Sequence, residues 1–130
     1  MGTRAIVKLN GKIVAFTHWD GNPNVLGRDL VALFENIKSS DYDYGKKPFK
    51  MKKDFVLGVC LMYQVDGTKN SADIQEWEYD IRDDGVYAKF LLKENANFVK
   101  LPELYEFLLY DIDSFVISNG KIKKTKKGGW

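Results

Sequence analysis

The dipeptide Asn10-Gly11 constrains the fold most, because it separates two stretches that read as β-strands, residues 4–9 and 12–19. A two-residue type I′ turn needs a positive φ angle at both positions, and Asn followed by Gly tolerates this best. The turn therefore predicts a β-hairpin and also determines which residues face one another. On one side the predicted pairs are Leu9 with Lys12, Val7 with Val14, Ala5 with Phe16 and Thr3 with His18; on the other they are Lys8 with Ile13, Ile6 with Ala15 and Arg4 with Thr17, with Trp19 diagonal to Arg4. Both sides hold apolar residues, so we expect a sheet that is covered at least partly on both faces.

Apolar periodicity and turn residues indicate the remaining elements. From Gly27 to Ser39-Ser40, apolar residues recur as on one face of a helix, at Leu30, Val31, Phe34 and Ile37. Residues 74–81 alternate between acidic and apolar side chains and, with residues 86–92 beyond Asp84-Gly85, predict a second hairpin. We read residues 41–53 and 66–72 as loops, residues 101–112 as a helix with Pro102 in its first turn, and residues 115–118 with 121–124 as a last hairpin.

The stretch Phe55–Val65 is almost continuously apolar, and periodicity alone does not separate a buried helix from a buried strand there. Its Leu, Met and Cys content favours a helix, for which Asp54 is a candidate N-cap. Together these elements predict a single α+β domain, an antiparallel sheet of about four to six strands with two or three packed helices. We place this domain at residues 1–120, followed by a basic C-terminal tail at residues 121–130.

The composition excludes several classes of protein. With 130 residues, of which 45% are hydrophobic, the chain can bury a core without disulfide or metal staples. Its single cysteine, Cys60, rules out an internal disulfide and a thiolate metal cluster, and its apolar surroundings indicate a core residue rather than a nucleophile. No apolar run approaches the ~18 residues that span a bilayer, and the first residues lack a signal-peptide pattern. We therefore expect a cytoplasmic protein that binds no cofactor, metal or membrane.

The charges are unevenly distributed along the chain. Two clusters without any acidic residue hold ten of the 20 basic residues: Lys46, Lys47, Lys50, Lys52 and Lys53, and then Lys121, Lys123, Lys124, Lys126 and Lys127. The rest of the chain holds 10 basic against 18 acidic residues. Such segregation is compatible with an acidic partner or a nucleic acid. Because neither cluster contains arginine, the usual residue for bidentate phosphate contacts, a solvated loop and tail is the simpler interpretation.

The tetrapeptide His18-Trp19-Asp20-Gly21 is the strongest candidate for a functional site. Its histidine is the only one in the chain and lies at a strand end beside a loop, where scaffolds often present catalytic or binding groups. The register places Thr3 and Arg4 at the same end of the hairpin, where Asp20 would orient the imidazole or pair with Arg4. In the alternative, structural interpretation, Asp20-Gly21 only turns the chain, Trp19 fills the core, and Arg4 and Asp20 form an ion pair beneath the indole.

Other catalytic patterns are weak. The sequence has no phosphate-binding loop and no Gly-x-Ser-x-Gly elbow, and one histidine with one cysteine does not make a common zinc site. The carboxylates of Glu76, Glu78 and Asp80 alternate along one predicted strand and read as a solvated face with Lys89 and Lys93 as neighbours.

The N-terminal motifs resemble a family of small uncharacterised proteins found in phages, bacteria and some archaea and viruses. The residues that resemble its opening are Met1-Gly2-Thr3-Arg4, then His18-Trp19-Asp20-Gly21 with Pro23, and Gly27. Residues 1–35 match well, and residues 74–90, with Trp77-Glu78-Tyr79, Asp84-Gly85 and Tyr87, match more loosely. Asn22, where the family commonly has an aromatic residue, and the lysine-rich tail depart from it. The resemblance implies that Arg4, Trp19, Asp20, Gly21 and Pro23 belong together, and it implies no activity.

The sequence thus favours a small accessory binding protein of mobile-element origin, whose ligand it does not identify. One alternative is a hydrolase or transferase that uses His18, Asp20 and Arg4. A second alternative is nucleic-acid binding through the two lysine clusters. The candidate site comprises Thr3, Arg4, His18, Trp19, Asp20, Gly21 and Pro23.

Overall fold

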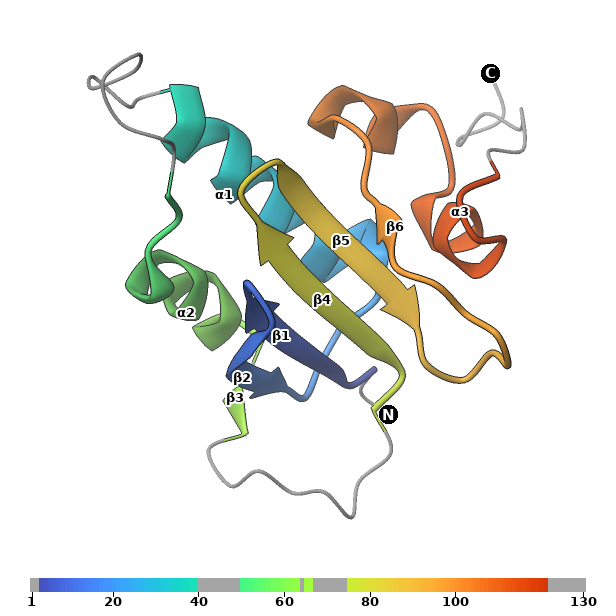
Figure 1. The fold of residues 1–130 in the computed structure, drawn as a ribbon, viewed down its shortest axis with the longest axis horizontal. Helices are drawn as coiled ribbons and strands as arrows, with labels where there is room; N and C mark the ends of the chain where they lie inside the picture. Colours follow the sequence, from blue (N-terminus) through green and yellow to red (C-terminus); the bar gives the residue numbers. More distant parts are fainter. Residues whose placement is uncertain (1–2, 40–49, 64, 67–74, 122–130) are drawn as a thin grey trace.

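The computed structural model describes residues 3–39, 50–63, 65–66 and 75–121, and within these ranges the chain forms one sheet with helices packed against it (Figure 1). The six strands of the described ranges follow the order β3-β2-β1-β4-β5-β6. They are β1 (Ala5–Leu9), β2 (Lys12–Thr17), β3 (Val65–Asp66), β4 (Trp77–Arg82), β5 (Gly85–Phe90) and β6 (Val99–Lys100). The helices are α1 (Arg28–Ser39), α2 (Lys53–Leu61) and α3 (Ile112–Ile117), with a π-helical turn η1 (Pro23–Gly27) and a 3-10 turn η2 (Leu104–Leu108). The predicted α+β fold class is confirmed.

The first hairpin forms as predicted at its turn but shifts by one residue further along. Asn10 and Gly11 have φ angles of 49° and 80°, and the pairs Leu9–Lys12 and Lys8–Ile13 are present. Beyond them Val7 pairs with Ala15 rather than Val14, because a β-bulge adds one residue to β2. The predicted pairs closer to the N-terminus are therefore wrong, including that of Thr3 with His18.

The sheet is mixed, so the prediction of an antiparallel sheet is wrong at one place. β1 pairs with β4 in parallel, whereas the other neighbouring strands are antiparallel. Between β2 and β4 the chain passes through η1, α1 and α2, and a connection of this length permits a parallel neighbour. The predicted second hairpin, β4 with β5, is confirmed.

One face of the sheet forms the core. Buried side chains alternate along β1, β4 and β5 and meet the buried stripe of α1; they are Ala5, Val7, Trp77, Tyr79, Ile81, Val86, Ala88, Leu30, Val31 and Phe34. The prediction of an amphipathic helix ending at Ser39 is confirmed, although the turn η1 precedes it.

On the opposite face the predicted solvated carboxylates Glu78 and Asp80 are instead buried. Lys8 Nζ lies 2.6 Å from Glu78 Oε2, and Arg82 Nε lies 3.0 Å from Asp80 Oδ2. These ion pairs engage both carboxylates, so Glu78 and Asp80 do not form a free acidic surface.

The apolar stretch after residue 52 is a helix, α2, as its composition favoured, and it ends before the short strand β3. Asp54 lies in the first turn of α2 and is not its N-cap; Lys52 occupies that position without a side-chain hydrogen bond.

The predicted single helix over residues 101–112 is wrong. Asp111 caps a new helix, α3, by accepting a hydrogen bond from Ser114 N, so the chain breaks between η2 and α3. Residues 115–117 belong to α3 and not to a strand, which excludes their part in the predicted last hairpin.

Several predictions lie outside the described residues. These are the tail from residue 122 onward, the loop at 40–49 with Lys46 and Lys47, and the lysines Lys123, Lys124, Lys126 and Lys127. Lys50, Lys52, Lys53 and Lys121 are described and exposed. No helix within the described ranges is long and apolar enough to cross a membrane.

Gly21 lies where the chain crosses the start of β1 and touches the centre of the sheet. Its N donates to Thr3 O at 2.9 Å, and its O accepts from the Tyr79 hydroxyl at 2.5 Å. A Cβ at this position would lie 2.7 Å from Thr3 O and 2.8 Å from Ala5 Cβ, which is closer than real contacts allow. Glycine is required here by space.

We expect Gly21→Ala to destabilise the protein by roughly 1–3 kcal/mol, because the added methyl must displace backbone and Ala5. Gly58→Ala is the matched control: in the described part of the chain, no atom outside the helix backbone lies within 4 Å of the added Cβ, and alanine is the better helix former. Thermal melts of dilute protein should show a lower Tm for the first variant and an equal or higher Tm for the second. If Gly21→Ala and the parent protein have the same Tm, the close approach of Gly21 to Thr3 and Ala5 is contradicted.

Candidate functional site

Arg4, His18 and Trp19 lie together where β1 begins and β2 ends. Arg4 Nε donates to His18 Nδ1 at 3.3 Å, and Arg4 Nη2 lies 3.4 Å from His18 Nε2. The Trp19 indole meets the imidazole edge-on, with ring centroids 5.0 Å apart. The bulge in β2 favours this cluster, because the shifted register pairs Ala5 with Thr17, and Arg4 and His18 are the next residues along the two strands. With Nδ1 accepting from Arg4, that nitrogen is not open to accept a proton from a substrate.

Of the predicted structural roles, the described residues show the chain turn at Asp20 but neither an Arg4–Asp20 ion pair nor a core position for Trp19. Within the described ranges no hydrogen bond or ion pair joins Asp20 to Arg4 or His18, so Arg4 contacts the imidazole and not the predicted carboxylate. Trp19 is 42% exposed and therefore does not fill the core. The exposed Asp20 has a φ of 49°, a left-handed conformation that Asp tolerates, and it turns the chain toward Gly21 as predicted.

The remaining members of the predicted site are structural. Thr3 contributes its carbonyl to Gly21, and Pro23 is buried as the first residue of η1. Asn22 Nδ2 donates to Asp113 Oδ2 at 3.0 Å, and Asn24 N donates to Asp113 Oδ1 at 2.7 Å. The asparagine at position 22 therefore fastens η1 to α3.

Two tyrosines connect this corner to the core. His18 N and Trp19 N both donate to Tyr63 O, at 3.1 and 3.3 Å, so the end of β2 lies at the C-terminal end of α2. Burial and a hydrogen bond to Asp29 raise the pKa of Tyr63 well above its ordinary value, and burial does the same to the pKa of Tyr79. Both phenols stay protonated near neutral pH and are poor general bases.

Cys60 and metal ligation add no catalytic group in the described part of the chain. Cys60 is fully buried in α2, and burial raises the pKa of its thiol to about 12, so the prediction of a core cysteine is confirmed. No group of three or more His, Cys, Asp and Glu among the described residues could hold a metal ion.

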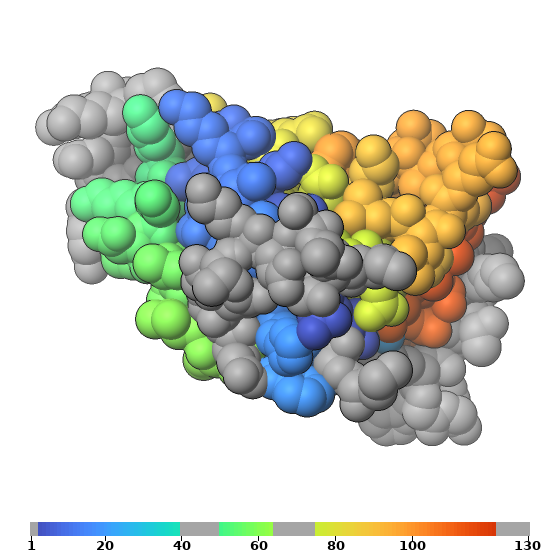
Figure 2. Space-filling model, turned by 90° about the horizontal axis from the view of Figure 1, so that it is seen from below, coloured from blue at the N-terminus to red at the C-terminus, as the bar shows by residue number. Residues whose placement is uncertain are grey.

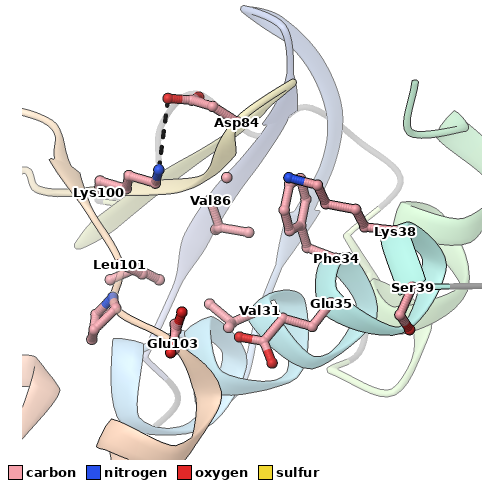
Figure 3. Close-up of a pocket in the computed structure, with 12 residues that line it drawn as sticks. Val31, Phe34, Glu35, Lys38, Ser39, Asp84, Val86, Lys100, Leu101 and Glu103 are labelled. Carbon is pink, nitrogen blue, oxygen red and sulfur yellow. Dashed lines mark ion pairs between the residues drawn. The ribbon is translucent and has the colours of Figure 1, made fainter. Parts of the chain in front are cut away.

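A first groove lies between α1, the β4–β5 turn and β6 and has a volume of about 530 Å³ (Figure 3). Its floor is apolar, formed by Val31, Phe34, Val86 and Leu101. Charged side chains surround this floor: Lys100 Nζ lies 3.8 Å from Asp84 Oδ2, and Lys38 Nζ lies 5.6 Å from the Phe34 ring centroid. We call it the α1–β6 groove.

A second groove, the α1–η2 groove, shares Glu35 and Glu103 with the first and has a volume of about 610 Å³. Its apolar lining comes from Ala32 of α1 and from Leu104, Tyr105, Phe107 and Leu108 of η2; Arg28, Asp29, Glu35 and Glu103 supply the charged part. Glu35 Oε2 accepts a hydrogen bond from Leu104 N at 2.9 Å and so holds η2 beside α1. Sequence reasoning missed this groove because it read η2 and α3 as one helix.

Comparisons of the chain with protein-family models, with curated proteins and with solved structures find no match. The resemblance of the N-terminal motifs to the family of phage and prokaryotic proteins therefore stays a prediction.

Substitutions at Asp20 separate a backbone role from a carboxylate role. We expect Asp20→Asn to change stability by less than about 0.5 kcal/mol, because Asn also tolerates positive φ. Asp20→Val should lose roughly 1–2 kcal/mol, since a β-branched residue is strained there. Urea denaturation measures both; an Asn variant as damaged as the Val variant would show that the carboxylate matters.

The buried thiol of Cys60 should react with Ellman's reagent only as fast as the molecule opens. Raising the pH from neutral should accelerate a free-thiol control but leave native Cys60 slow, because a thiol with a pKa of about 12 is still protonated there. In denaturant the protein is open, so Cys60 should lose this protection and react fully. The absorbance at 412 nm should then show ~full release of the reagent's anion. Rapid reaction of the folded protein would contradict the burial of Cys60.

Proposed function

We propose that the protein is a small accessory binding protein that holds a segment of a partner protein in the α1–η2 groove. One observation supports this most: Leu108 and Tyr105 are 72% and 57% exposed beside the apolar lining of the groove. Large apolar side chains gathered at a groove are typical of surfaces that bind another protein. The mobile-element origin is what the resemblance of the N-terminal motifs implies.

The charges around the groove indicate the chemistry of the partner. The acidic side chains Asp29, Glu35 and Glu103 outnumber the one basic side chain, Arg28, whose Nε lies 3.7 Å from Asp29 Oδ1. Glu103 is exposed, and Glu35 uses one oxygen to bind Leu104 N. A segment with an apolar side chain flanked by Lys or Arg fits this lining, because the apolar group covers Leu108 while the cations meet the carboxylates.

The two alternative functions find less support in the contacts. For a hydrolase or transferase, Arg4 engages His18, and no hydrogen bond or ion pair among the described residues joins Asp20 to either of them. For nucleic-acid binding, only part of the two lysine clusters lies in the described residues, so the contacts add little support. The described lysines are Lys50, Lys52, Lys53 and Lys121. Both alternatives stay predictions.

Random peptides displayed on bacteria and selected on the immobilised protein test the groove. We expect enrichment of sequences in which an apolar residue is flanked by Lys or Arg. A synthetic peptide of the enriched sequence should bind Leu108→Glu about tenfold more weakly or worse in calorimetry, because the new carboxylate stands in the apolar contact.

The matched control is Leu92→Glu, which replaces another exposed leucine, in the β5–β6 connection, and should bind like the parent. Absence of any enriched sequence, or a peptide that binds both variants equally well, would refute the α1–η2 groove as the binding site.

A further inference from the structure

Helix α2 lies at one edge of the molecule and is apolar on nearly all sides. Val56 and Cys60 are buried toward the sheet, where α2 packs on β2. The other side shows Phe55, Gly58, Leu61 and Met62, and the last two are 63% and 71% exposed. We call these four residues the outer face of α2. Helix α2 is coloured green and lies at the rim of the molecule in Figure 2.

Gly58 stands at the centre of the outer face. It is three residues from Phe55 and from Leu61, so all three lie on the same side of the helix. A glycine inside a helix is unfavourable, and among the described residues no atom beyond the helix's own backbone lies within 4 Å of a Cβ placed there. Glycine at the centre of an exposed apolar face lets another helix approach closely, since interaxial distance depends on the side chains at the contact.

The two ends of α2 carry opposite charges. Lys50, Lys52 and Lys53 are exposed at its N-terminal end. At its C-terminal end, Tyr63 binds the backbone of residues 18 and 19, and its phenol is acted on by the negative charges of Asp29 and Asp20 and by the positive charge of Arg28, so the formal charge there is net negative. The helix dipole adds a partial negative charge at this same end.

We propose that the outer face of α2 is the interface of a symmetric dimer with a second copy of this chain, in which the two α2 helices pack antiparallel and cross at Gly58. A two-fold axis at Gly58 brings Phe55 of one copy against Leu61 of the other, an aromatic–aliphatic contact. The same arrangement sets the lysine end of each helix beside the acidic end of its partner. The surface is therefore self-complementary in charge, and Gly58 at its centre permits close approach of the two helices.

An anionic membrane is the other occupant that a basic, apolar helix suggests, and two observations favour the second copy. Asp54 and Asp20 are exposed at the two ends of the face, where they would be repelled by anionic lipid. Gly58, at the centre, offers no side chain to insert into lipid, whereas it suits a close helix contact.

Sedimentation equilibrium at protein concentrations from about 1 to about 200 µM tests the dimer. The parent protein should pass from monomer to dimer over this range. Gly58→Gln should weaken the dimer about tenfold or more by separating the helices, yet dilute Gly58→Gln should melt higher because Gln is the better helix former. A residue with only a structural role in the monomer would not shift the two readouts in opposite directions.

Leu61→Glu should also weaken the dimer about tenfold or more, because a charge would be buried without a partner. Leu92→Glu, an exposed leucine outside α2, is the matched control and should leave it unchanged. A monomeric parent protein at the highest concentration, or a dimer that Gly58→Gln and Leu61→Glu leave intact, would overturn the proposal.

Charge reversal tests the antiparallel orientation. Lys52→Glu with Lys53→Glu, and Asp20→Lys, should each weaken self-association, and an equimolar mixture of the two variants should form heterodimers. Failure of the mixture to associate, with both variants folded by circular dichroism, would overturn this orientation.

Co-sedimentation with vesicles of phosphatidylserine and phosphatidylcholine tests the membrane alternative. A parent protein that stays monomeric and sediments with these vesicles through α2 would replace the dimer by a membrane surface. The peptide measurements at Leu108 are independent of all these results, because Leu108 lies in η2 and not in α2.

Discussion

The close approach of Gly21 to the start of β1 is the contact on which the arrangement of β1, β4 and η1 depends. Its two backbone hydrogen bonds, to Thr3 O and from the Tyr79 hydroxyl, join the first strand, the central strand β4 and the beginning of η1 at one point. From this point the chain leads backward to the end of β2, which binds Tyr63, and forward into α1. Both surfaces proposed to bind a partner contain α1 or pack against it, so a bulkier residue at Gly21 would disturb them together.

Local patterns were sufficient to predict the elements whose signals lie within a few residues. Asn10-Gly11 predicted its turn, the spacing of Leu30, Val31 and Phe34 predicted α1, and the alternation along residues 74–81 predicted β4. The bulge in β2 and the parallel pairing of β1 with β4 were not predictable in this way, because they depend on which distant strands come together. That one-residue shift replaced the expected Thr3–His18 contact by the Arg4–His18 contact.

The same difference explains what the sequence revealed of the candidate site. Residues 18–21 do lie together at one corner, as neighbours in sequence at a strand end must, but the roles of their side chains depend on distant groups such as Tyr63. The α1–η2 groove joins segments that are about 70 residues apart, and no local motif marks it. One available signal was Asp111 directly before the apolar Ile112, the pattern of a helix N-cap. Recognising this cap would have predicted a chain break between η2 and α3, and it would have placed Leu108 outside the buried stripe of a single long helix.

The two proposed surfaces are compatible with one another because they use different elements on either side of α1 (Figure 1). A dimer through α2 would leave η2 uncovered and would present two α1–η2 grooves per assembly. Two linked grooves bind a partner that repeats its basic and apolar segment far more tightly than one groove does, since the second contact forms at a high effective concentration. Modest affinity at each groove would then suffice to bind such a partner stably. Gly58 is unfavourable in an isolated helix, but by permitting the dimer it would strengthen binding at the α1–η2 grooves, although it does not line them.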